Sequence, residues 1–122
     1  MIATLWIDAR FSAGHFLPHV AAGSRCRRPH GHNYRVRIRI TGPMKHDGLQ
    51  TGMVVDFDEI KPKLAAVLEQ LDHHDLNTIL PNPTAEHVAE WILCRLPECV
   101  DTIELREMED CGVVLHRSDL CR

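Results

Sequence analysis

Hydrophobic and polar residues alternate along two stretches in the first third of the chain. Residues 33–41 place three arginines between apolar side chains, and residues 4–13 show the same period of two. Because successive side chains of a strand point to opposite faces of a sheet, each stretch predicts a strand with one buried face. The prolines and glycines of residues 16–31 predict a loop between them. The side chains expected to face inward are Leu5, Ile7, Ala9, Phe11, Ala13, Tyr34, Val36, Ile38 and Ile40.

The apolar period changes to that of a helix in residues 56–71 and again in residues 84–97. Asp56, with Glu59 three residues later, resembles a capping pair at the start of the first helix. Pro62 lies past the first turn of that helix, so we expect either a local kink or a later start.

Residues 101–109 and 112–117 predict two further strands, joined by a turn at Cys111–Gly112. The order is strand, strand, helix, helix, strand, strand, which favours an α+β fold with an antiparallel four-stranded sheet and both helices on one face. Residues 1–122 are long enough for one domain and too short for two. A sheet of four strands has exposed edges, and pairing of edges between subunits would remove them.

Composition excludes several classes of protein. The net charge of −3 gives no bulk basic field for nucleic acid, and no apolar run approaches the roughly 20 residues that span a membrane. The N-terminus lacks the basic-then-apolar pattern of a signal peptide, so we expect a cytoplasmic protein with no membrane partner. Five cysteines, an odd number, predict reduced thiols rather than disulfides. Nine histidines are the one unusual count and point to metal or proton chemistry.

Three histidines are expected to converge beneath the sheet. If the first strand continues, His15 follows on its apolar face, and counting back from Tyr34 puts His32 and His30 on the inward face of the second strand. Three protein nitrogens with an open fourth position are the arrangement of a catalytic zinc. The alternative is that the His-Gly-His sequence binds nothing and that His15 is a core histidine with satisfied hydrogen bonds.

Cys26 lies four residues before His30 and is flanked by Arg25, Arg27 and Arg28. Positive neighbours and a nearby divalent cation favour the thiolate, which is the reactive form of cysteine. The alternative is an inert, buried thiol.

Two further groups carry candidate chemistry. Asp72 and His73 are adjacent at the end of the first predicted helix, and a carboxylate can orient an imidazole for proton transfer. Their alternative is a polar loop with solvated charges. Glu107 shares the inward parity of Ile103 and Leu105, and an inward carboxylate needs either a ligand or a partner such as an arginine.

With these residues in view, the chain resembles the 6-pyruvoyl-tetrahydropterin synthase superfamily, and within it the 6-carboxy-5,6,7,8-tetrahydropterin synthase branch of queuosine synthesis. The resemblance runs nearly end to end and rests on a set of motifs in the order of the family. These are FSAGHFLPH, CRRPHGHNYRV, GMVVDFDEIK, LDHHDLN, NPTAEHVAEWI and ELRE.

The resemblance implies the T-fold, a ββααββ unit that assembles into rings, here a homohexamer, with active sites between subunits. It implies that zinc is bound by His15, His30 and His32, and that the substrate is a pterin triphosphate, 7,8-dihydroneopterin triphosphate. The expected products are 6-carboxy-5,6,7,8-tetrahydropterin, acetaldehyde and triphosphate. The site roles that it implies are proton acceptor for Cys26, proton relay for Asp72 and His73, and pterin anchor for Glu107.

The spacing around Cys26 favours the carboxy branch. The pyruvoyl synthases of animal type carry a longer insertion between the cysteine and the His-Gly-His motif, and an aldolase-like branch has glutamate in place of the cysteine. Pro29 departs from the larger apolar residue that the family has before His30. Arg27 and Arg28 are candidates for holding the triphosphate. A pyruvoyl synthase and a non-catalytic module that binds zinc or pterin are the alternatives.

Overall fold

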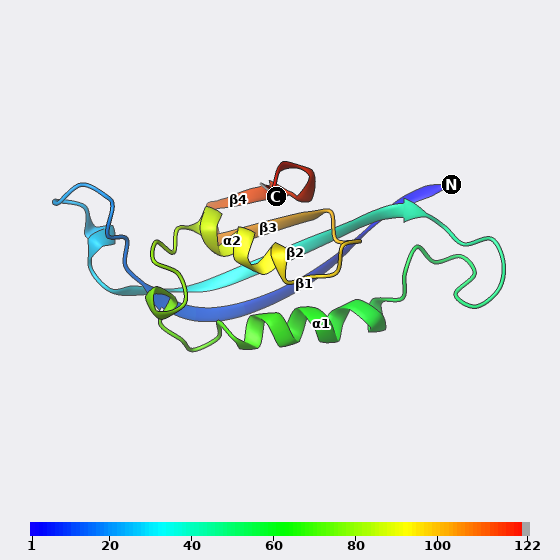
Figure 1. Cartoon of the computed structure of the whole chain (residues 1–122), viewed down its shortest axis with the longest axis horizontal. Coiled ribbons are helices and arrows are strands. Elements are labelled where there is room, and N and C mark those ends of the chain that lie inside the picture. Colours follow the sequence, from blue (N-terminus) through cyan, green and yellow to red (C-terminus); the bar gives the residue numbers. More distant parts are fainter. Residues whose placement is uncertain (121–122) are drawn as a thin grey trace.

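The computed structural model describes residues 1–120 and shows an antiparallel sheet with the strand order β1-β2-β3-β4 and two helices (Figure 1). Cys121 therefore lies outside the described residues, and the free thiols within them are Cys26, Cys94, Cys99 and Cys111. Neither helix of the described chain has the length and apolar character that a membrane crossing demands. The elements are β1 Ile2–His15, β2 His30–Pro43, α1 Phe57–Glu69, α2 Ala85–Cys94, β3 Thr102–Met108 and β4 Cys111–His116.

The long hairpin of β1 and β2 forms the centre of the structure. Its register pairs Ile7 with Ile38, Phe11 with Tyr34, and His15 with His30, so inward positions meet inward positions along the whole hairpin. The rings of Phe11 and Tyr34 stack with their centroids 4.6 Å apart. Both strands are longer than the alternating pattern predicted, and the extra residues carry the histidines.

Both helices pack on the same face of the sheet, as predicted (Figure 1). α1 contacts β1, and α2 contacts β3 and β4. The buried side chains of the two helices join the inward side chains of the strands in one apolar core. The helical members of that core include Ile60, Leu64, Val67, Leu68, Val88, Ala89, Ile92 and Leu93.

The start of α1 follows the predicted cap. The Asp56 carboxylate accepts a hydrogen bond from the Asp58 backbone N–H at 2.9 Å, while the Glu59 carboxylate accepts one from Gln50 instead of completing a capping pair. α1 begins at Phe57 and continues through Pro62, so the expectation of a later start is wrong. The local kink stays a prediction.

The turn between β3 and β4 is formed by Glu109 and Asp110, because Cys111 already begins β4. The predicted turn at Cys111–Gly112 is therefore wrong. Gly112 is needed for a close approach: a Cβ on this residue would lie 2.5 Å from the Leu105 carbonyl oxygen. The glycine thus allows β4 to pack tightly on β3 and does not mark the turn.

β1 and β4 form the two edges of the sheet among residues 1–120. The segment after α1 covers one end of the β1 edge. The His73 N–H donates to the Ser12 carbonyl oxygen at 2.6 Å, and the Gly14 N–H donates to the His74 carbonyl oxygen at 3.1 Å. This backbone pairing fixes the polar segment after α1 beside the last residues of β1.

Arg117, just after β4, ties the end of α2 to the start of β3. Its side chain is 11% exposed. Nη2 donates to the carbonyl oxygens of Leu93 at 2.9 Å and Pro97 at 3.0 Å, and Nε donates to that of Val100 at 2.6 Å. The Leu93 and Pro97 carbonyls also accept from the backbone N–H groups of Leu96 and Val100, so the guanidinium adds a second donor there. It also joins the end of α2 to the segment before β3 through the Val100 carbonyl.

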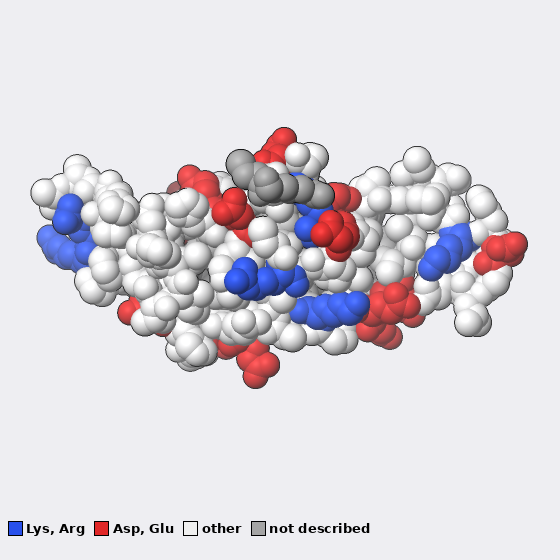
Figure 2. All heavy atoms as spheres, viewed as in Figure 1, with Lys and Arg blue, Asp and Glu red and all other residues white. Residues whose placement is uncertain are grey.

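Charged residues are mixed on the face seen in Figure 2, where basic and acidic side chains form small, separate groups.

Candidate metal and catalytic site

Three imidazoles meet at the end of the β1–β2 hairpin. His15 is the last residue of β1 and is 2% exposed. His30 lies opposite it, and His32 lies opposite Ala13. The ring centroids of His15 and His30 are 4.6 Å apart, and that of His32 is 5.0 Å from each of the other two. The parity of the two strands therefore brings the three predicted residues together.

Backbone carbonyls orient two of the rings. His15 Nδ1 is 2.8 Å from the carbonyl oxygen of Pro83, and His30 Nδ1 is 2.7 Å from that of Arg28. A carbonyl can only accept, so each Nδ1 carries the proton and each Nε2 keeps its lone pair. Such contacts to the second nitrogen are typical of histidines that bind metals.

The nitrogens that remain fit a metal ion. Nε2 of His15 and Nε2 of His32 are buried and have no hydrogen-bond partner within residues 1–120. One ligand atom from each of the three histidines lies within 4.8 Å of the others. Two unpaired buried nitrogens are costly unless something binds them. Three imidazoles suit zinc and leave a coordination position for substrate.

The surroundings of His32 favour its neutral imidazole. Burial lowers the pKa of His32 from its ordinary value, and the positive charges of His15 and His30 would lower it further, whereas Glu107 opposes the shift. Tyr34 packs below the cluster, fully buried, with its hydroxyl 3.5 Å from His15 Nδ1. Burial and the charge of Glu107 raise the pKa of this phenol, so it stays protonated at neutral pH.

Cys26 lies in the connection between β1 and β2, in a short 3₁₀ turn of Arg25–Arg27. The Ser24 hydroxyl caps this turn by accepting from the Cys26 N–H at 3.2 Å, and the Cys26 carbonyl accepts from the Leu17 N–H at 2.8 Å. The thiol is half-buried and is not part of the three-histidine cluster. The turn thus positions Cys26 without making it a metal ligand.

Arg27 and Arg28 are exposed in the same connection. Arg27 Nη1 donates to the Val20 carbonyl oxygen at 3.1 Å, and the backbone of Arg28 holds His30 as described above. Neither guanidinium forms an ion pair with a carboxylate in the described part of the chain. Both are therefore available to an anionic ligand.

Asp72 and His73 form an ion pair on the β1 edge, with Oδ2 of the carboxylate 2.9 Å from Nδ1 of the imidazole. Oδ1 of Asp72 accepts from the Ser12 N–H at 2.9 Å. The Ser12 N–H, together with the His73 contact, lowers the pKa of Asp72 below its ordinary value. The His73 side chain is 82% exposed and its backbone has a φ of 58°, a left-handed conformation that strong local contacts must hold.

His73 and His32 line one open pocket beside the end of the hairpin, but the pair makes no polar contact with the other candidate residues in the described chain. Within residues 1–120, no hydrogen bond or ion pair links Asp72 or His73 to the histidine cluster or to Cys26. The carboxylate still orients the ring, because it holds Nδ1 and leaves Nε2 of His73 facing solvent.

Glu107 points inward near the end of β3, as its parity predicted. Its Oε2 lies 3.7 Å from His32 Nε2, and its side chain is 23% exposed. No arginine pairs with it in the described residues, so the arginine alternative from the sequence is wrong. The carboxylate therefore stays open to a ligand that enters beside the cluster.

Sequence reasoning missed four contributors: the Pro83 and Arg28 carbonyls, the Ser12 N–H and Tyr34. Tyr34 carried a usable signal, because it has the same inward parity as His32. The Pro83 carbonyl carried none, since it reaches His15 across 68 positions of the chain.

Comparison with known proteins gives this geometry a context. Residues 4–119 match the protein family described as 6-pyruvoyl tetrahydropterin synthase. The chain belongs to this family.

Individual members of the family and solved structures are also similar to the chain. A 6-carboxy-5,6,7,8-tetrahydropterin synthase of Synechocystis sp. is 40% identical over 101 residues, which cover 77% of each protein. A dihydroneopterin monophosphate aldolase of Pyrococcus furiosus is 37% identical over 67 residues, covering 55% of this chain and 54% of the aldolase.

The fold of the family is confirmed as well. The structure of Caenorhabditis elegans 6-pyruvoyl tetrahydropterin synthase superposes with a TM-score of 0.83 at 23% identity, covering 95% of this chain and 96% of that chain. The four-stranded antiparallel sheet with two helices on one face is therefore the T-fold that the resemblance implied.

Proposed function

We propose that this protein is a zinc-dependent lyase that converts 7,8-dihydroneopterin triphosphate and one water to 6-carboxy-5,6,7,8-tetrahydropterin, acetaldehyde and triphosphate. The observation that carries the proposal is the cluster of His15, His30 and His32, with two buried nitrogens that have no partner within the described chain. The Synechocystis relative, named as a 6-carboxytetrahydropterin synthase, supports the choice of reaction. Its product would serve as a precursor of 7-deazaguanine compounds such as queuosine, made in the cytoplasm.

The three histidines would hold zinc through His15 Nε2, His30 Nε2 and His32 Nε2. When bound, zinc supplies Lewis-acid stabilisation of negative charge on an oxygen of the substrate side chain. The protein prepares the ligands, because the Pro83 and Arg28 carbonyls fix the protonated nitrogens of His15 and His30.

Cys26 is the proposed proton acceptor. Its turn ends at Arg27, three residues before β2 begins at His30, so the connection that carries the thiol leads into the metal-binding strand. The thiolate would remove a proton from the carbon next to the polarised oxygen, and carbon–carbon cleavage and loss of triphosphate would follow. Arg27 and Arg28 are the proposed contacts of the triphosphate.

Asp72 and His73 are the proposed relay, and we place them in the active site of a neighbouring copy. The pair is oriented but faces solvent, and it shares no contact with Cys26 of its own chain within the described residues. Among the described residues, β4 and the part of β1 before Ser12 also leave edges open for pairing between copies. A ring of copies, a homohexamer in this proposal, would bring each relay to the thiol of an adjacent chain.

Glu107 is the proposed anchor of the pterin. Its carboxylate can accept two parallel hydrogen bonds from the planar, guanidine-like edge of a pterin. The distance of 3.7 Å to His32 puts this anchor beside the cluster, so one bound substrate would reach both.

The rival reactions differ in what they release. A pyruvoyl synthase would keep all carbon atoms of the substrate, and an aldolase of the kind found in Pyrococcus furiosus would act on the same class of pterin. A non-catalytic module would bind zinc or pterin and leave the substrate unchanged. The presence of Cys26, where the aldolase-like branch has glutamate, favours the carboxy reaction.

The test is mass analysis of products formed from 7,8-dihydroneopterin triphosphate by the purified, zinc-loaded protein. Release of acetaldehyde with a 6-carboxy product supports the proposal. A pyruvoyl product, or unchanged substrate, refutes it.

Variants assign the roles. Cys26→Ala should abolish turnover and retain zinc, whereas Cys94→Ala, an exposed thiol of α2, should change neither. Mixed assemblies of Cys26→Ala and His73→Ala chains should regain part of the activity that each variant lacks alone. Failure of the mixture to regain activity would contradict the shared site.

A further inference from the structure

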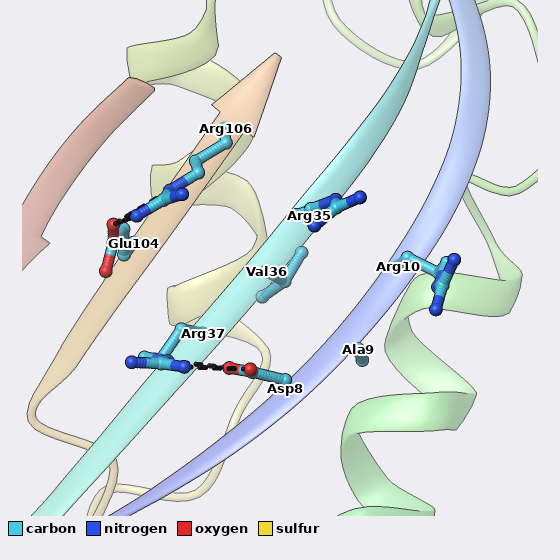
Figure 3. A pocket seen from close by; sticks show the side chains of 8 residues that line it. All are labelled: Asp8, Ala9, Arg10, Arg35, Val36, Arg37, Glu104 and Arg106. Atoms are coloured by element: carbon cyan, nitrogen blue, oxygen red, sulfur yellow. Dashed lines mark hydrogen bonds and ion pairs between the residues drawn. The ribbon is translucent and has the colours of Figure 1, made fainter. Parts of the chain in front are cut away.

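The face of the sheet away from the helices carries an arginine-rich cleft, which we call the arginine cleft. It encloses about 260 Å³ and is lined by side chains of β1, β2 and β3. This volume is below the roughly 300–1,000 Å³ of sites for drug-sized molecules, so the cleft suits a small ligand. Its charged residues are Asp8, Arg10, Arg35, Arg37, Glu104 and Arg106 (Figure 3).

Three of these arginines stand in a row across the strands. Arg10 of β1 is the direct partner of Arg35 of β2, and Arg35 is the direct partner of Arg106 of β3. Like charges directly opposite on neighbouring strands destabilise a sheet. The row therefore needs counter-charges, and the cleft does not supply enough of them.

The two carboxylates of the cleft are already engaged. Asp8 accepts two hydrogen bonds from Arg37, at 2.7 and 2.9 Å. Glu104 bridges Arg106 at 3.1 Å and Arg39 at 3.3 Å. Figure 3 shows the Asp8–Arg37 and Glu104–Arg106 pairings as dashed lines.

Arg10 and Arg35 have no carboxylate within ion-pair distance in residues 1–120. Figure 3 shows the Arg35 guanidinium extending from β2 on the side of β1, where Arg10 projects. The four arginines and two carboxylates that line the cleft leave two positive charges unbalanced.

We propose that the arginine cleft binds an inorganic oligophosphate across Arg10, Arg35 and Arg106. Guanidinium groups bind phosphate oxygens through paired N–H donors. Neighbouring strands are about 4.8 Å apart, so a row over three strands spans roughly 10 Å, which is longer than one phosphate and suits a short chain of them. The histidine cluster lies on the inward face of the same sheet, so this site is separate from the proposed catalytic site and stands without it.

The test is calorimetric titration of the full-length protein with inorganic tripolyphosphate at low and at high salt. We expect saturable binding that weakens as salt rises, because exposed charges are screened. Arg35→Gln and Arg10→Gln should each weaken binding about tenfold or more, since each removes a charged donor. Glu104→Gln should tighten binding, because it frees Arg106 and Arg39 from their carboxylate.

The matched control is Lys63→Gln, which removes one positive charge from an exposed position of α1, on the other face of the sheet. It should bind tripolyphosphate as the unchanged protein does. Arg35→Lys keeps the charge but loses the paired donors. Its affinity for tripolyphosphate should therefore lie between those of the unchanged protein and Arg35→Gln. This variant replaces Arg35→Gln in the test if Arg35→Gln does not fold.

Three results would overturn the proposal. The first is equal weakening by Lys63→Gln and Arg35→Gln, which would mean that only net charge matters. The second is tripolyphosphate binding that neither Arg10→Gln nor Arg35→Gln changes. The third is no binding at all, as expected if carboxylates of a second copy cover the row.

Discussion

Metal binding to the three histidines should stabilise the folded protein, and the size of the effect can be estimated from the structure. His15 Nε2 and His32 Nε2 are buried without a hydrogen-bond partner in the described chain, and each such group costs about 1–3 kcal/mol. At a free zinc concentration about 100 times the dissociation constant, binding adds about 2.7 kcal/mol. For a chain of 122 residues this corresponds to a rise in Tm of roughly 10 °C.

A substitution at a buried position usually lowers the free energy of unfolding, but His32→Leu should not do so in the metal-free protein. Without metal, the variant loses a polar atom that had no partner, so its free energy of unfolding should equal that of the unchanged protein or exceed it by about 1 kcal/mol. With zinc, the variant lacks one of three ligands and its Tm should not rise. The two proteins therefore change order of stability when metal is added.

The assay is thermal unfolding followed by circular dichroism, with chelator-treated protein and with added zinc. His46→Gln is the control, because His46 is exposed in the connection between β2 and α1; this variant should keep the full zinc-induced rise. The reasoning is refuted if His32→Leu keeps the same rise. It is also refuted if the metal-free variant loses about 2 kcal/mol or more, as a well-packed core residue would.

Three further predictions concern single side chains. The pKa of Asp72 is lowered in the folded state, so its contribution to stability is present above its unfolded pKa of about 4 and is lost as the pH falls through the folded value; Asp72→Asn should give a shallower acid-unfolding curve by circular dichroism. Glu107→Gln should raise KM for the pterin substrate about tenfold or more, with zinc content unchanged in elemental analysis. Arg117→Met should lower the free energy of unfolding in urea by about 1–3 kcal/mol, because it removes the hydrogen bonds of a charged group to the Leu93, Pro97 and Val100 carbonyl oxygens.

Much of the fold follows from local patterns. The period of two identified both long strands and their buried side chains, since one face of the sheet is covered by helices and the other is not. The same parity, extended through Gly14 and Gly31, brought the three histidines together, because the β1–β2 pairing continues through these two residues. The prediction of the histidine cluster thus depended on the period of two, which holds up to the ends of both strands.

Other parts could not be obtained locally. Gly112 indicated a turn, yet its role is close contact with Leu105, and such a contact depends on a neighbouring strand. The relation of Asp72 and His73 to Cys26 is also beyond sequence patterns, because backbone pairing with Ser12 decides where the pair lies. Long-range pairing of this kind leaves no periodic signal.

The Pro83 carbonyl that orients His15 stands one residue before Thr84, whose hydroxyl accepts from the His87 N–H and caps α2. The start of a helix and the aim of a metal-binding ring therefore share one short piece of backbone. By linkage, a bound metal ion would raise the free energy of unfolding of the first turn of α2. Destabilising that turn would in return lower the affinity for the metal ion. Changes at Thr84, which offers no ligand, would in this way alter metal affinity from outside the coordination sphere.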